Sequence, residues 1–133
     1  MDRMIFINLP VHDLTASRRF YTGLGFGIND MFTGDHCVCV VVSETIFVML
    51  LDHERFADFV SVPIADARAS AQVINCLSAQ TRAEVDEFVA AAVAHGGAEN
   101  RDLQEEASMY GRSVTDPDGH VWEILYVEVP ADA

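Results

Sequence analysis

The chain of 133 residues is 50% hydrophobic, and its 21 acidic and 8 basic side chains give a net charge of -13 at pH 7. This charge repels nucleic-acid phosphates and anionic membranes, so we predict no nucleic-acid and no membrane partner. Every base is an arginine, and the lack of lysine excludes Schiff-base chemistry. The length predicts one domain, and the lack of a signal peptide or spanning segment predicts a cytoplasmic protein.

The first part of the chain predicts a strand, a helix and further strands. Apolar and β-branched residues predict strands over 4–11, 36–44 and 45–52, and residues 29–34 predict a twisted strand or a turn. Residues 13–26 predict a short helix, because Asp13 can cap it and Gly23 and Gly25 can end it. Residues 53–60 predict a short helical turn before a linker over 61–70.

The second part of the chain repeats this order. Residues 71–79 predict a strand, and residues 81–97 predict a helix that Thr81 and Glu84 begin with a capping box. Strands are predicted over 98–107, 108–116 and 120–129, with an Asp-Pro-Asp-Gly turn between the last two. The acidic residues of this turn need no role beyond making it.

The repeated order predicts an α+β fold in which two tandem βαβββ modules form a curved mixed sheet around a cleft. Module one covers residues 1–60 and module two covers residues 71–129 of a single domain over 1–133. The polar segment 99–107 would be an exposed sheet edge unless another chain covers it. This segment predicts a homodimer.

Two segments carry a resemblance to a known family. INLPVHDLTASRRFYTGLGF (7–26) resembles the opening of the vicinal oxygen chelate superfamily, which includes glyoxalases, bleomycin-resistance proteins and extradiol dioxygenases. SMYGRSVTDPDGHVWEILY (108–126) resembles its closing signature, in which a glutamate follows the glycine of the Asp-Pro-Asp-Gly turn by four residues. The chain is similar to the small glyoxalase-like and PhnB-like members, and the repeat order agrees with them over nearly its full length.

The resemblance also carries over the positions of the family's metal ligands. Metal-bearing members hold a divalent cation with four side chains, mostly His and Glu; the last of these falls on Glu123, whereas the others fall on Phe6, Met49 and Ile74. One carboxylate with three apolar side chains lacks the nitrogen and oxygen donors that such a cation needs. We therefore predict no metal and no cofactor, and an apolar cleft floor at Phe6, Met49 and Ile74.

Four polar residues complete the candidate site, each with a functional and a structural interpretation. Glu123 can act as a general base, or it can pair with an arginine such as Arg112. Arg112 can clamp a ligand carboxylate or lie at the surface, and Tyr110 shares its strand face. Asn8 shares a face with Phe6 and can bind a ligand or the neighbouring backbone.

These observations predict a metal-free protein that binds a small, partly apolar molecule in its cleft. The alternative is a lyase or isomerase related to lactoylglutathione lyase, in which Glu123 is the general base.

Overall fold

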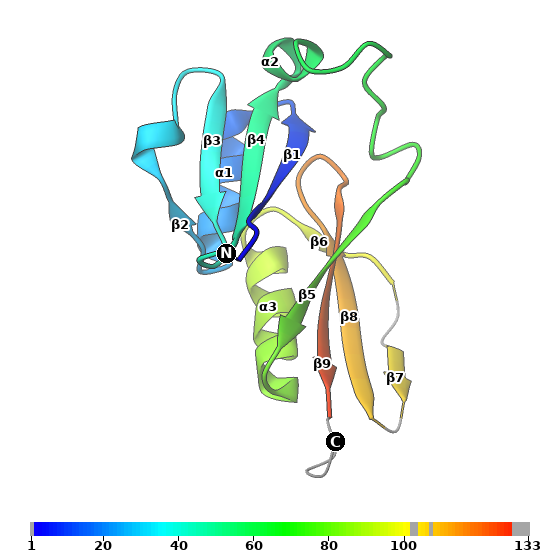
Figure 1. Ribbon diagram of the computed structural model, residues 1–133. Helices are drawn as coiled ribbons and strands as arrows, with labels where there is room; N and C mark the ends of the chain where they lie inside the picture. The colour runs from blue at the N-terminus through cyan, green and yellow to red at the C-terminus, as the bar shows by residue number, and fades with distance from the viewer. Residues whose placement is uncertain (1, 102–103, 107, 129–133) are drawn as a thin grey trace.

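The chain folds into two modules of the same element order, which the computed structural model describes over residues 2–101, 104–106 and 108–128 (Figure 1). Module one forms a four-stranded sheet of order β1-β4-β3-β2, and module two a sheet of order β5-β9-β8-β6 in which β7 also pairs with β8. The first strand of each module is parallel to the last, and the other pairs are antiparallel. The predicted α+β fold of two βαβββ modules is confirmed.

Module one contains two helices and a single short 3-10 helix among its strands. Its elements are β1 (Ile5–Val11), α1 (Leu14–Gly23), β2 (Gly27–Ile28), η1 (Asp30–Phe32), β3 (Cys37–Val41), β4 (Ile46–Asp52) and α2 (His53–Ala57). Asp13 caps α1 as predicted, because its carboxylate accepts hydrogen bonds from the backbone N–H groups of Thr15 and Ala16. Residues 29–34, predicted as a strand or turn, instead begin with η1, which Asn29 caps.

Module two repeats this plan after a connection over residues 58–73. Its elements are β5 (Ile74–Ala79), α3 (Arg82–Ala94), β6 (Ala98–Glu99), β7 (Gln104–Glu106), β8 (Met109–Thr115) and β9 (Val121–Val127). Thr81 caps α3 as predicted, since its hydroxyl accepts a hydrogen bond from the Glu84 backbone N–H at 3.0 Å. The predicted edge segment lies partly outside the described residues, and its described strands β6 and β7 both pair with β8.

One hydrophobic core joins the modules, because α1 and α3 contact each other while each packs on its own sheet. Phe20 and Tyr21 of α1, Phe88 of α3, Val48 of β4 and Trp122 of β9 belong to this core. The opposite face of each sheet is turned away from the helices, and we call these the outward faces. Within the described part of the chain, no helix is both long and apolar enough to cross a membrane.

A buried group of hydrogen bonds also connects the modules at the Asp-Pro-Asp-Gly turn. Asp116 and Asp118 are only 4% and 5% exposed. Tyr21 of α1 donates to Asp116 at 2.7 Å, while the Ser17 hydroxyl and the His12 backbone N–H donate to Asp118 at 3.3 and 2.9 Å. The sequence predicted no role for these acids beyond the turn, whereas in the structure they link module two to module one.

Candidate functional site

The outward face of module two carries Glu123. In the register of β5 with β9, Cys76 lies opposite Glu123, and Ile74 lies on the same face two residues earlier. The Cys76 thiol donates a hydrogen bond to the Glu123 carboxylate at 3.6 Å. On the neighbouring strand, a Cβ at Gly111 would lie 3.8 Å from Glu123 Oε1 and 3.1 Å from Leu125. A side chain at this position would therefore crowd Leu125 and come into van der Waals contact with the Glu123 carboxylate.

Cys76 is a neutral hydrogen-bond donor to Glu123 at physiological pH. Partial burial of the thiol raises the pKa of Cys76 to about 11, and the negative charge of Glu123 adds to the shift. Nucleophilic cysteines instead have a lowered pKa, which positive neighbours or a helix N-terminus produce. Glu123 can therefore accept or donate a proton while the thiol of Cys76 orients its carboxylate. The raised pKa of Cys76 makes this cysteine a poor nucleophile.

The outward face of module one is apolar and aromatic. Phe6 of β1 stacks on Phe47 of β4 with ring centroids 4.9 Å apart, and Asn8 lies beside Met49 in the register of the same strands. The side chain of Asn8 donates to the Phe6 carbonyl at 3.0 Å, which is the structural interpretation given for it above. The structure thus brings Phe6, Asn8 and Met49 together on one face.

Arg112 and Tyr110 lie on the opposite side of the module-two sheet from Glu123. The register of β8 with β9 places Ser113 opposite Glu123 and Arg112 opposite Ile124, whose side chain belongs to the core. Because Arg112 and Glu123 lie on opposite faces of the sheet, the suggested pairing of Glu123 with Arg112 is wrong. A ligand bound at Glu123 on the outward face would not reach Arg112 through the sheet.

Arg112 forms a network with acidic residues near α3. Its guanidinium donates to the Glu99 carboxylate at 2.8 and 3.1 Å and to Asp86 at 2.9 Å, and the Tyr110 hydroxyl also donates to Asp86. The hydrogen bonds to Glu99 raise the pKa of Arg112, while those from Tyr110 and Arg112 lower the pKa of Asp86. The guanidinium is therefore already engaged by carboxylates of this chain.

The donor set does not fit a divalent cation. Of the four carried-over ligand positions, only Glu123 offers oxygen, and its neighbour Cys76 is protonated. Among the residues that the structure describes, no three His, Cys, Asp or Glu side chains come together in a way that could hold a metal ion. Stable dication sites use four or more nitrogen, oxygen or thiolate ligands.

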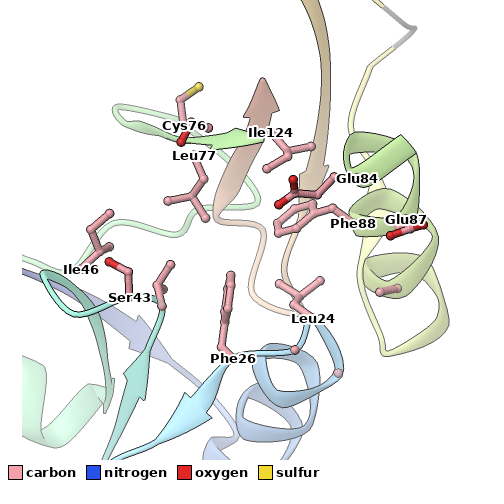
Figure 2. Close-up of a pocket in the computed structure, with 15 residues that line it drawn as sticks. Leu24, Phe26, Ser43, Ile46, Cys76, Leu77, Glu84, Glu87, Phe88 and Ile124 are labelled. Atoms are coloured by element: carbon pink, nitrogen blue, oxygen red, sulfur yellow. The ribbon is translucent and has the colours of Figure 1, made fainter. Parts of the chain in front are cut away.

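A separate open cavity of about 710 Å³ lies between the modules on the helix side of the sheets (Figure 2). We call it the inter-module groove. Leu24, Phe26 and Ile46 line it from module one, and Leu77 and Phe88 line it from module two. This groove could not be predicted from the sequence, because its walls come from segments far apart in the chain that no local pattern connects.

Comparisons with known proteins agree with this fold. A family model described as "Bleomycin resistance protein-like N-terminal" matches residues 3–43. A glyoxalase-related enzyme from Fulvimarina pelagi is 24% identical with a TM-score of 0.80, covering 100% of this chain and 96% of that chain. A hypothetical protein from S. aureus is 28% identical with a TM-score of 0.79, covering 95% of this chain and 94% of that chain.

A lactoylglutathione lyase from Agrobacterium tumefaciens is more distant, with 20% identity and a TM-score of 0.68, covering 95% of this chain and 94% of that chain. No curated protein matches the chain. The family model covers the start of module one, and the solved structures share both modules in the same order. Residues 3–43 therefore resemble bleomycin-resistance-like proteins, and nearly the whole chain shares the fold of glyoxalase/bleomycin-resistance proteins.

Proposed function

We propose that the protein binds a small, partly apolar molecule on its outward sheet faces without a metal ion. The observation that carries this proposal is the exposed aromatic stack of Phe6 on Phe47, where Phe6 occupies a position that the family resemblance carries over as a metal-ligand position. Phe6 remains 49% exposed although it is apolar. An aromatic surface of this kind favours contact with flat or apolar molecules.

Two copies of the chain would complete such a site. Within one chain, Phe6 and Met49 belong to one sheet and Ile74 and Glu123 to the other, and each outward face lies on the side away from the helices. Ile74 is 63% exposed, and exposed apolar patches in soluble proteins commonly mark interaction surfaces. We propose a homodimer in which module one of one copy faces module two of its partner.

A reducing compartment suits this protein, because Cys37, Cys39 and Cys76 are all free thiols. We therefore propose a cytoplasmic location.

The binding proposal is tested by thermal unfolding of the purified protein against a library of aromatic and antibiotic compounds in the presence of a chelator. We expect some compounds to raise the melting temperature of the wild type and to lose this effect in Phe6→Ala. Phe59→Ala is the matched control, because Phe59 is also exposed but belongs to the connection after α2 and not to a sheet strand. A library without any stabilising compound, or equal losses in both variants, would contradict the proposal.

A lyase or isomerase is the second candidate, and the environment of Glu123 favours it. The carboxylate lies on the outward face, and Cys76 donates a hydrogen bond to it. A carboxylate in this position can abstract a proton next to a substrate carbonyl.

Turnover of the methylglyoxal–glutathione hemithioacetal tests the enzymatic alternative. This alternative expects turnover that Glu123→Gln abolishes and that Glu44→Gln, a substitution in the exposed turn between β3 and β4, leaves unchanged. If wild-type protein shows no turnover, or if Glu123→Gln retains it in full, Glu123 is not the base.

A further inference from the structure

We propose that the inter-module groove is a second binding site, which takes an organic monocation with an apolar body and an ammonium group. The groove offers an apolar wall from both modules and, on one side, two carboxylates that form no ion pair within the described part of the chain. Its volume of about 710 Å³ lies within the usual range of small-molecule pockets. The proposal does not depend on the outward-face site.

The wall of the groove is the exposed margin of the hydrophobic core. Phe26 and Phe88 face each other across the module boundary with ring centroids 6.4 Å apart and an interplanar angle of 51°. Leu24, Leu77 and Ile124 extend this apolar surface, and Figure 2 shows their side chains around the same space. A bound apolar group would therefore contact both modules at once and gain free energy from burial.

The negative charge of the groove favours a positively charged ligand. Glu84 and Glu87 of α3 line it, and Figure 2 shows the Glu84 carboxylate directed over the Phe88 ring into the space. Among the residues that the structure describes, no arginine or histidine lines the groove and neither carboxylate forms an ion pair. The net charge of -13 also repels anions.

A cation in the groove would meet two kinds of favourable partner. The ammonium group can donate a charge-assisted hydrogen bond to Glu84, which uses one carboxylate oxygen to accept from the Gln80 backbone N–H at 2.7 Å. The faces of Phe26 and Phe88 add a cation–π attraction. A neutral molecule of the same shape would have only the apolar contacts, and an anion would be repelled by Glu84 and Glu87.

The groove is distinct from the outward face, although both border strand β5. Cys76 lines the groove, yet Figure 2 shows its sulfur pointing away from the apolar wall, and its hydrogen bond goes to Glu123 on the outward face. Glu123 does not line the groove. A substitution of Glu123 therefore separates the two sites experimentally.

Calorimetric titration with three matched compounds tests the charge preference of the groove. The probes are 3-phenylpropylammonium, 3-phenylpropanol and 3-phenylpropionate, which share a phenyl ring and chain length but differ in charge. We expect the ammonium compound to bind about tenfold more tightly than the alcohol, because it gains a charge-assisted hydrogen bond. The carboxylate should show no binding. Equal affinities for the amine and the alcohol would overturn the proposal.

Glu84→Gln isolates the carboxylate that the proposal invokes. Glutamine can replace glutamate in a capping box, so the start of α3 should be retained. We expect this variant to bind the ammonium probe about tenfold more weakly and the alcohol unchanged. Glu54→Gln removes the same charge from the first turn of α2 and should leave affinity unchanged, as should Glu123→Gln. An equal loss in Glu54→Gln would show general electrostatic attraction, and a loss in Glu123→Gln would place the ligand on the outward face; either result overturns the proposal.

Ala91→Trp tests the groove by filling it. Ala91 of α3 lines the groove, whereas the adjacent Ala90 is exposed and does not line it. We expect Ala91→Trp to abolish binding of the amine and the alcohol, and Ala90→Trp to leave it intact. Light scattering of both variants identifies a different occupant: if Ala91→Trp alone converts a dimer into a monomer, a second copy of the chain fills the groove and the proposal is wrong.

Discussion

Asp116 lies at the centre of the buried hydrogen bonds that hold module two against α1. It accepts from the Tyr21 hydroxyl and from the backbone N–H groups of Asp118 and His120. The Tyr21 hydroxyl in turn accepts from Trp122 Nε1 at 2.9 Å. Burial raises the pKa of Asp116, while the hydrogen bond from Tyr21 opposes this rise. The Tyr21 hydroxyl thus donates to the buried Asp116 carboxyl and accepts from the buried Trp122 indole at the same time.

Tyr21→Phe removes this phenol group and should reduce the free energy of unfolding by about 1 to 3 kcal/mol, because a buried donor and a buried carboxyl each lose a partner. The loss should be larger at pH 7 than at pH 4. The raised pKa means that the Asp116 contribution to stability is lost as pH increases, and without Tyr21 the pKa rises further.

Urea unfolding at the two pH values measures this difference. Tyr126→Phe is the control, since Tyr126 is only partly buried and should change stability by less than about 0.5 kcal/mol. Equal stability of Tyr21→Phe and wild type would contradict the role given to Asp116.

The sequence pattern predicted which candidate residues share a face within one strand, but not how the faces of neighbouring strands combine. Alternation along β9 correctly separated Glu123 from Trp122, because side chains of a strand alternate between its faces. It also placed Tyr110 and Arg112 on one face. It could not predict which residues of β8 share a face with Glu123 of β9, because the register of the two strands depends on the turn that joins them. This register decides that Arg112 lies with α3.

Helix caps are the elements that local sequence predicted most closely. Asp13 and Thr81 cap α1 and α3 as expected, because a cap is defined by residues only a few positions apart. The ends of strands were predicted less accurately. The pattern predicted that the first strand of module two begins at residue 71, whereas β5 begins at Ile74. The short helix α2 begins at His53 and is capped by Asp52, whose carboxylate accepts from the Arg55 backbone N–H at 2.8 Å and also contacts His36 Nδ1 at 2.6 Å.

This contact makes the α2 cap dependent on pH. The hydrogen bond to Asp52 raises the pKa of His36, and the bond from Arg55, followed by that from His36, lowers the pKa of Asp52. A raised histidine pKa gives a stability contribution that is complete below about pH 6.5 and disappears as pH rises through the folded-state value. The lowered pKa of Asp52 gives a second contribution to stability, which is lost as pH falls through the folded-state pKa of this carboxyl group.

NMR titration of the histidines tests this coupling. We expect His36 in the wild type to titrate above about pH 6.5 and to return toward that value in Asp52→Asn, because asparagine keeps the cap oxygen but loses the charge. An unchanged titration of His36 in the variant would show that Asp52 does not cause the shift.

At the scale of the whole molecule, the packing of the modules was beyond sequence analysis. The repeat order predicted two βαβββ modules, but the contacts between Tyr21 and Asp116 and between Phe26 and Phe88 join residues more than 60 positions apart. Their consequence is that α1 and α3 share one core and the sheets turn their other faces outward. The polar turn and the inter-module groove both follow from this packing.

Methyl NMR can show whether an apolar molecule binds on the outward faces without a metal. The methyl signals of Met49 and Ile74 would be followed while a stabilising compound is added in the presence of a chelator. Met31, which is exposed on η1, serves as the internal control. The account predicts that Met49 and Ile74 shift while Met31 does not. Signals that remain still, or that shift only after a divalent cation is added, would contradict it.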